Sequence, residues 1–112
     1  MPTTEMWEVL VPTKTKLGKP IRLKHHKNWD AYVRKITGGL TILKPGRGQW
    51  IEPTTGSLFE ERVIPVRIAC TRAQIEKIVD FTIQHYNQIA VMALKVSDDV
   101  ILKYAEGSKT NG

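Results

Sequence analysis

The chain of 112 residues has a single cysteine, Cys70, and lacks any apolar run as long as the roughly 20 residues of a membrane helix. One cysteine cannot form an internal disulfide, and cysteine-poor chains are typical of reducing compartments, so we expect a cytoplasmic protein with no membrane segment. Residues 1–7 also lack the basic and then apolar pattern of a secretion signal. Cys70 ends an apolar run, and nothing beside it favours a thiolate, which predicts a small buried side chain.

The short motifs of common enzymes are also missing, because neither G-x-S-x-G, H-E-x-x-H, C-x-x-C nor H-x-E occurs. His25 and His26 are adjacent, so both rings cannot readily meet one metal ion from a helix. His85 lies near the end of a predicted helix, where the helix dipole alone favours a cation. Asp98 and Asp99 are typical of a turn, since calcium needs more oxygen ligands. We therefore predict no catalytic residue, no metal site and no cofactor.

Positive charge is in excess, with a formal net charge of +6. A basic surface attracts anions, so nucleic acid, nucleotides and acidic proteins are the expected classes of partner, and a merely solvated surface is the alternative. An RNA-binding sheet would show the pattern K/R-G-F/Y-G/A-F, which is absent. Nucleic-acid binding is therefore an alternative hypothesis, carried by six early residues: Lys14, Lys16, Lys19, Arg22, Lys24 and Lys27.

Residue patterns predict the first part of the fold. Residues 6–12 alternate like a strand, and residues 13–20 form a polar loop. Residues 21–24 continue or re-enter the sheet. Asn28 is expected to cap a helix, and Gly38 occupies the position of a left-handed C-cap.

The remaining chain is predicted to be mainly strands, with one further helix. The expected strands are residues 40–43, 49–52, 58–70, 89–96 and 100–104. Turns are expected at residues 45–48 and 53–56, and Pro65 indicates a bulge or a sheet edge. Thr71 and Gln74 match a capping box at the start of the helix. The nearly continuous apolar run at residues 89–96 is typical of a strand buried on both faces.

The order strand, helix, strand, strand, helix, strand predicts an α+β fold of the ferredoxin-like βαββαβ type, with two helices on one face of an antiparallel sheet of four to five strands. We expect one domain over residues 1–105 and a flexible tail over residues 106–112. Both sides of the strands carry apolar residues, since Leu40 and Ile42 oppose Leu43. The face without helices then needs cover, so we expect a homodimer or higher oligomer joined sheet to sheet.

The glycine-rich stretch of residues 38–62 is the main candidate region for function. It satisfies neither the P-loop pattern nor the dinucleotide fingerprint, because Gly46 and Gly48 are followed by strand residues. Turn chemistry explains the glycines: Gly46 and Gly48 permit positive φ, and Gly56 closes a second reversal. Trp50, beside them, either caps the core or stacks on a planar ligand at a pocket mouth.

Part of this stretch resembles a known family. Gly39 to Ile42 (G-L-T-I), Gly48 to Trp50 (G-Q-W), Gly56 and Glu61 are similar to the "G-L-T-V … G-Q-W … G … E" core of short bacterial proteins of unknown function. The resemblance spans roughly residues 29–92 and implies the ferredoxin-like fold, without implying a reaction. Members are often exported, whereas this chain shows no signal. Its size and basic charge are also typical of a mobile-element or phage product.

The leading hypothesis is a non-catalytic module that holds a small anionic or planar, nucleotide-like ligand in a sheet-face or inter-subunit pocket. Trp50 would stack on the ligand, and Arg47 and Arg62 would pair with its negative charge. Alternation along the strand turns Glu61 away from Glu60, so that Glu61 would fix the orientation of the ligand.

Two further aromatic residues, Trp7 and Tyr86, are expected to line the pocket with Trp50, together with Met92. A third hypothesis is a small enzyme of the dimeric α+β-barrel type, in which His85 or Glu61 is the acid–base group. An ordinary surface ion pair is the alternative reading of Glu61.

Overall fold

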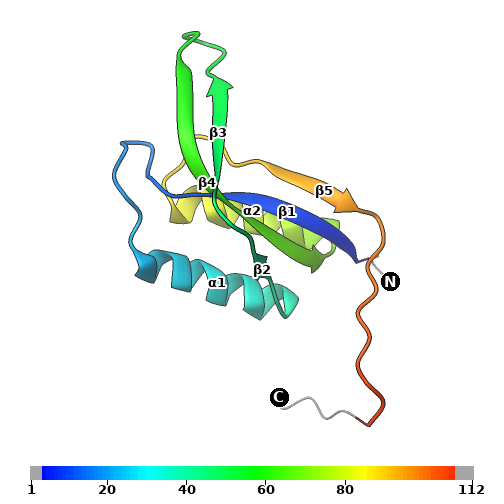
Figure 1. Ribbon diagram of the computed structural model, residues 1–112. Helices are drawn as coiled ribbons and strands as arrows, with labels where there is room; N and C mark the ends of the chain where they lie inside the picture. Colours follow the sequence, from blue (N-terminus) through cyan, green and yellow to red (C-terminus); the bar gives the residue numbers. More distant parts are fainter. Residues whose placement is uncertain (1–3, 108–112) are drawn as a thin grey trace.

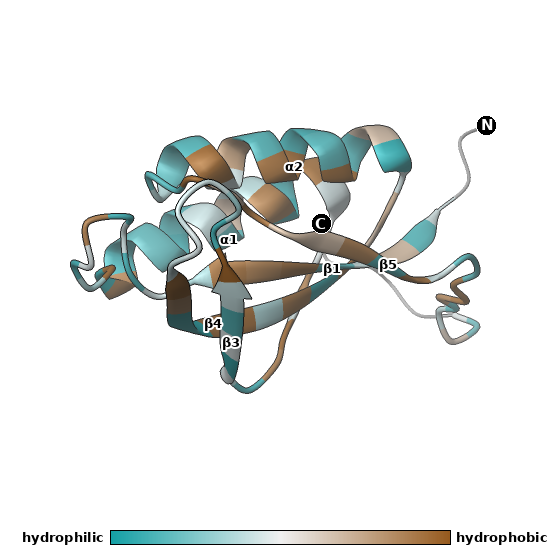
Figure 2. Cartoon of the chain, turned by 90° about the horizontal axis from the view of Figure 1, so that it is seen from above, coloured by the Kyte–Doolittle hydropathy of each residue, from teal (hydrophilic) through white to brown (hydrophobic). Residues whose placement is uncertain are grey.

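The structure is a computed structural model that describes residues 4–107. Its elements follow the order β1 (Glu5–Pro12), α1 (Leu23–Thr37), β2 (Thr41–Ile42), β3 (Gly46–Ile51), β4 (Leu58–Cys70), α2 (Arg72–His85) and β5 (Ala93–Ser97). The antiparallel sheet has the order β2-β4-β1-β5, and β3 also pairs with β4. Both helices cover the same face (Figures 1 and 2). The predicted ferredoxin-like α+β fold is confirmed.

The core lies between this sheet and the two helices. In β1, alternate residues point toward the helices, so Trp7 and Val9 are buried while Glu8 between them is not. Val9 pairs with Val66 and Trp7 with Ile68, and this register places the buried sides of β1 and β4 together. Burial of such side chains is the main force that holds the layers together. The helices contribute Trp29, Val33, Ile75 and Ile78 to the same cluster.

One buried hydrogen bond joins the helices. The Trp29 indole Nε1–H donates to the Thr82 hydroxyl over 2.8 Å, and that hydroxyl donates to the carbonyl of Ile78. Trp29 and Thr82 are 1% and 0% exposed, so water cannot replace either bond. The pair therefore fixes how α1 lies against α2.

The predicted start of α1 is wrong. Asn28 lies inside the helix, which begins at Leu23, and the N-cap Arg22 makes no capping bond through its side chain. The early turns are held instead by a tertiary contact, because His26 Nδ1 lies 2.8 Å from the hydroxyl of Tyr86. Residues 21–24 consequently do not re-enter the sheet. The left-handed C-cap at Gly38 is confirmed, with φ 92°.

For α2, the predicted capping box is present. The Thr71 hydroxyl accepts from the Gln74 backbone N–H, and the Gln74 side chain accepts from the Thr71 backbone N–H. Neither α1 nor α2, the two helices of residues 4–107, has the length and apolar content needed to cross a membrane.

Together β2 and β3 form one interrupted edge strand along β4. The pairs Ile42↔Val66 and Gly46↔Val63 leave one extra residue on the edge side, and this bulge lies opposite Pro65. The carbonyl of Pro65 accepts from the backbone N–H of Leu43, so the N–H that proline lacks also falls on this side. Of the two alternatives predicted from Pro65, a bulge and a sheet edge, the structure has the bulge, with the extra residue on the neighbouring strand.

The predicted turn at residues 45–48 is wrong, because β3 already begins at Gly46. Neither Gly46 nor Gly48 has a positive φ, whereas Gly56 does, at 73°. The reversal in this region is the second predicted turn, where the Gly56 N–H donates to the carbonyl of Glu52 over 2.8 Å.

Two predictions for the last part of the chain are wrong. The strand expected at residues 89–96 is Ala93–Ser97, an exposed edge strand and not one buried on both faces. Residues 100–104 form no strand. The expected tail at residues 106–112 lies outside the described residues from position 108 onward. The apolar run therefore indicated that a strand forms here, but it did not indicate which faces of the strand are buried.

Replacing Thr82 with valine is expected to reduce the free energy of unfolding by about 1–3 kcal/mol, because the Trp29 N–H would stay buried without an acceptor. Urea unfolding of Thr82→Val measures the loss. The same replacement at exposed Thr41 is the control and should change stability by less than about 0.5 kcal/mol. Equal stability of Thr82→Val and the parent would contradict the role of this bond.

Candidate functional site

The candidate site arises because β4 is longer than β1. Their pairing stops at Pro12↔Val63, and the Thr13 hydroxyl then donates to the carbonyl of Arg62 over 2.7 Å as the chain leaves the sheet. The earlier part of β4 is paired only with β3, and the two form a hairpin that projects beyond the layers (Figure 1). A groove lies between this hairpin and the loop of residues 13–20.

This groove has a volume of about 470 Å³ and lies at the root of the hairpin. Its lining comes from the end of β1, the loop of residues 14–18, the hairpin, and the segment of residues 88–92. Gln88 fixes that segment, because its side-chain amide donates to the carbonyl of Lys14 over 2.8 Å. The volume lies within the about 300–1,000 Å³ of typical ligand pockets.

One face of the hairpin supplies the aromatic wall of the groove. Trp50 pairs directly with Phe59, and their rings stack with centroids 4.8 Å apart and planes 16° apart. Gly48 and Glu61, two residues further along each strand, form the next pair on this face. A side chain at Gly48 would lie against Glu61, since an added Cβ would come 3.8 Å from its Cγ. The missing side chain leaves the Glu61 carboxylate open to the groove.

Charges of both signs border the groove. Glu61 lies on the hairpin wall, while Lys14 and Lys16 lie on the loop opposite. None of the three makes an ion pair with another described residue. Leu10 and Val63 supply apolar surface between them. This arrangement can hold a flat apolar body with charged groups at its ends.

The structure brings some predicted site residues together and separates others. Trp50 and Glu61 both line the groove, and their role in holding a ligand stays a prediction. Arg47 and Arg62 form a direct cross-strand pair on the opposite face of the hairpin, so their predicted place beside Trp50 is wrong. The physical reason is the alternation of a strand, which places Arg47 and Arg62 on the face opposite Trp50 and Glu61.

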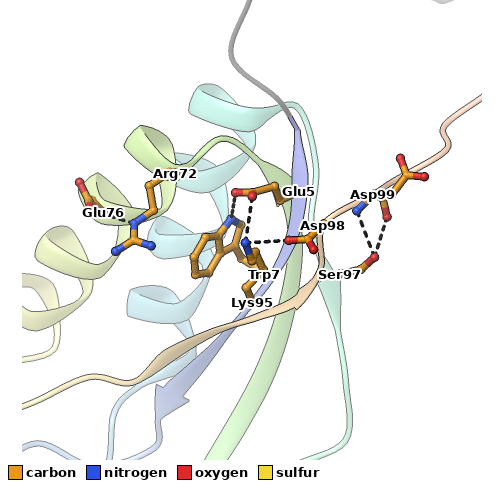
Figure 3. Close-up of polar contacts among 8 residues, drawn as sticks. All are labelled: Glu5, Trp7, Arg72, Glu76, Lys95, Ser97, Asp98 and Asp99. Carbon is orange, nitrogen blue, oxygen red and sulfur yellow. Dashed lines mark hydrogen bonds and ion pairs between the residues drawn. The ribbon is translucent and has the colours of Figure 1, made fainter.

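Trp7 and Tyr86 are core residues, 6% and 2% exposed. Contrary to the prediction, they do not line the groove. The Trp7 indole N–H donates to Glu5 over 3.2 Å, and the Arg72 guanidinium lies 5.4 Å from its ring centroid (Figure 3). A depression beside Trp7 is lined mainly by α2, beginning with Arg72, and by Val91 and Ala93. Trp7 therefore closes the core at the end of the molecule opposite the hairpin.

The three histidines lie where α1 packs against α2. His85 Nε2 donates to the carbonyl of His25 over 2.7 Å, and the His85 ring stacks on Phe81 with centroids 5.0 Å apart. His85 does not line the groove, so the structure does not bring the two predicted acid–base groups, His85 and Glu61, together. Within residues 4–107, no group of His, Cys, Asp or Glu side chains is arranged to hold a metal ion.

Burial alters the titration of two other groups that were candidates for function. It raises the pKa of the Cys70 thiol to about 11, with a smaller contribution from Glu5, so the predicted inert thiol is consistent with its place in the core. Burial likewise raises the pKa of Tyr86, and Asp30 adds to this shift.

The residues of the alternative nucleic-acid hypothesis lie in the loop after β1 and on the first turns of α1. Most of them are well exposed, and Lys14 and Lys16 belong to the rim of the groove. The structure thus places them along one continuous stretch of chain: Lys14, Lys16, Lys19, Arg22, Lys24 and Lys27.

Sequence reasoning missed Phe59 and residues 88–91 as parts of the site, whereas Met92 was expected in the pocket and lines the groove. A signal for Phe59 was present, because folding the hairpin about Gly56 places Phe59 opposite Trp50. For residues 88–91 no signal existed, since their position depends on the side-chain amide of Gln88 and on a bond from the Leu10 N–H to the Met92 carbonyl.

No family model and no curated protein sequence matches the chain. Among solved structures, a phage SAM lyase in complex with S-methyl-5'-thioadenosine is 14% identical, covers 97% of this chain and 95% of its own, and has a TM-score of 0.68. The periplasmic divalent cation tolerance protein CutA from Archaeoglobus fulgidus is 9% identical, with coverages of 90% and 89% and a TM-score of 0.63. The divalent cation tolerance protein of Thermus thermophilus is 11% identical, with coverages of 95% and 88% and a TM-score of 0.60.

These likenesses extend over nearly the whole chain at very low identity, so they show a shared fold. The family resemblance carried by Gly39 to Ile42 and Gly48 to Trp50 stays a prediction.

Acidification is expected to destabilise the protein through His26. Burial is the largest cause and lowers its pKa from 6.5, His85 and His25 act in the same direction, and Asp30 opposes them. The unfolded chain then binds the proton at a higher pH than the folded protein. The contribution to stability is therefore complete above pH 6.5 and falls as the pH drops toward the folded pKa.

Urea unfolding at about pH 7.5 and about pH 5.5 measures this effect, and the loss at the lower pH should shrink in His26→Gln. The control His25→Gln, on the exposed side of α1, should keep most of the loss. An equal loss in His26→Gln and the parent would assign the pH dependence to another group.

Proposed function

We propose that the protein is a small cytoplasmic binding module that self-associates and holds a planar, nucleotide-like ligand in the groove at the root of the hairpin. The stacked pair of Trp50 and Phe59 on the groove wall is the observation that carries the proposal. Aromatic side chains are suited to nucleobases, because a base gains about 1–3 kcal/mol from stacking without needing a fixed hydrogen-bond pattern.

The charged rim of the groove supports the same class of ligand. With the base against Trp50, a phosphate or other anionic end would meet Lys14 and Lys16 on the loop, in place of Arg47 and Arg62. Glu61 would accept hydrogen bonds from ribose hydroxyls or from an amino group. The groove thus supplies one surface for each part of a nucleotide.

The solved structures add support of a limited kind. The phage SAM lyase of the same fold holds S-methyl-5'-thioadenosine, which is an adenine nucleoside. That a ferredoxin-like domain of nearly equal length accommodates such a ligand supports the choice of ligand class for this chain. At 14% identity it supports neither a reaction nor the same contacts.

Nucleic-acid binding is the second candidate, favoured by the run of exposed basic residues from the loop after β1 into α1. A single-stranded nucleic acid would use the same aromatic wall and would add phosphate contacts along this surface. The two candidates differ in their dependence on salt, because several phosphate contacts make binding fall steeply as the salt concentration rises.

Removing the aromatic wall is expected to weaken ligand binding by about 1–3 kcal/mol, that is about 5- to 150-fold in Kd. The measurement is isothermal titration of the parent and Trp50→Ala with adenosine, AMP and S-methyl-5'-thioadenosine. Gly48→Val is a second variant, which fills the groove beside Glu61 without removing an aromatic ring.

Arg47→Ala is the matched control, because Arg47 lies on the same hairpin but on its other face, and it should bind like the parent. Absence of binding of all three compounds to the parent would refute the proposal. Retention of a labelled RNA oligonucleotide that is lost between about 50 and 200 mM salt would favour the second candidate.

A further inference from the structure

The projecting end of the hairpin exposes apolar surface on the face opposite the groove. Ile51 and Leu58 form the last pair of β3 and β4, and they are 65% and 61% exposed. Among the described residues, the outer edge of β3 has no strand partner. A two-stranded hairpin alone is marginally stable in water, and an open strand edge invites pairing with another chain.

A second exposed segment lies at the opposite end of the molecule. Residues 100–104 leave the sheet beyond β5 in an irregular, extended course, and Ile101 and Leu102 are 87% and 74% exposed. Figure 1 shows this segment on the side of the molecule away from the hairpin tip, and the molecule measures 56 Å along its longest axis. Within one chain, the two exposed surfaces therefore cannot cover each other.

The charges beside the two surfaces have opposite signs. Arg47 and Arg62 are paired directly across β3 and β4, and neither makes an ion pair with another residue of the described part of the chain. Two like charges in this position destabilise a sheet unless an anion lies near them. Lys95 makes ion pairs with Glu5 and Asp98. Asp99, which precedes the extended segment, is held to Ser97 only through its backbone, and its carboxylate points away from these ion pairs (Figure 3).

We propose that residues 99–104 of one copy pair as an added strand along β3 of a second copy. Asp99 then lies near Arg47 and Arg62 of the other copy. The added strand then runs parallel to β3 with Asp99 opposite Arg47, because in the antiparallel direction residues 100–104 would run away from the apolar end of the hairpin. Successive residues of a strand face opposite sides, so Ile101 lies on the face of Arg47, diagonal to Ile51, while Leu102 lies on the groove side. The inference rests on the self-association included in the proposed function, and it names the interface.

The lengths of the two surfaces agree. At about 3.3 Å per residue, six residues in an extended conformation span about 20 Å, which is also the length of the six residues of β3. Because the two surfaces lie at opposite ends, each copy offers one and accepts another. Such a head-to-tail contact closes into a ring when the rotation permits it.

Light scattering coupled to size-exclusion chromatography of the full chain tests the interface. The parent is expected to run as an oligomer, and Ile101→Asp combined with Leu102→Asp should weaken association about tenfold or more, because a charge would be buried at the contact. The control Leu23→Asp changes another exposed leucine, 67% exposed, on α1 and should leave the mass unchanged.

Another control addresses a contact through the sheet face instead. Leu94 lies on the open face of β5, so Leu94→Asp should also leave the mass unchanged. Dissociation by Leu94→Asp but not by the double variant would overturn the inference in favour of the sheet-to-sheet dimer. Circular dichroism confirms that each variant folds.

A charge exchange tests the register of the contact. Arg62→Glu and Asp99→Arg are each expected to weaken association about fivefold, and the double variant to recover most of it. Failure of the double variant to recover would overturn the pairing of Asp99 with the arginines.

A monomeric parent at about 100 µM would overturn the interface and the proposed self-association together. Ligand binding, measured separately by titration, would then still test the proposal that the groove holds a ligand. An oligomeric parent that binds no ligand would overturn only the proposal that the groove binds a ligand.

Discussion

The structure depends on the difference in length between its two central strands. β4 runs from Leu58 to Cys70, whereas β1 ends at Pro12, opposite Val63. All residues from Val63 to Cys70 pair with β1, and Val63, Val66 and Arg67 also pair with β2 or β3 on the other side. This part of β4 contributes buried residues of the core. The residues before Val63 have a partner on one side only. The stable half of β4 thus supports a half that could not fold by itself.

This mismatch creates both surfaces to which we assign a role. Where β1 departs, its loop stands apart from the hairpin, and the groove opens beneath Trp50. Beyond the groove, the same hairpin exposes a free edge and an apolar end. The open face of the sheet is a weaker candidate for an interface than expected from sequence, because the Glu8–Arg67 ion pair, with 3.1 Å between its charged atoms, lies on it among apolar residues.

The features that could be predicted from sequence are those caused by interactions between residues close together in the chain. The capping box of Thr71 and Gln74 and the C-cap at Gly38 act within a few residues, so α2 and the end of α1 were predictable. The start of α1 was not, because the contact of His26 with Tyr86 spans 60 positions of sequence.

The candidate site shows the same division. Alternation along the strand correctly turned Glu61 away from Glu60, since that is a property of any strand. Placing Arg47 and Arg62 required the cross-strand register, and the sequence offered two turns where the structure has one. Aromatic residues are typical of both pockets and cores, and only the packing of the folded chain shows to which of the two a given residue belongs. For this reason Trp7 and Tyr86 were assigned to the pocket although they lie in the core.

The two proposed roles of the hairpin are not independent of each other. A ligand against Trp50 and a second copy along β3 would contact opposite faces and the edge of the same two strands, and each would order a segment that the rest of the fold supports from one end only. A partner that orders the hairpin lowers the entropic cost of ordering it again for the other. By linkage, any gain in ligand affinity on assembly must equal the gain in assembly on ligand binding. The hairpin would then couple occupancy of the groove to the oligomeric state without a conformational change elsewhere in the protein.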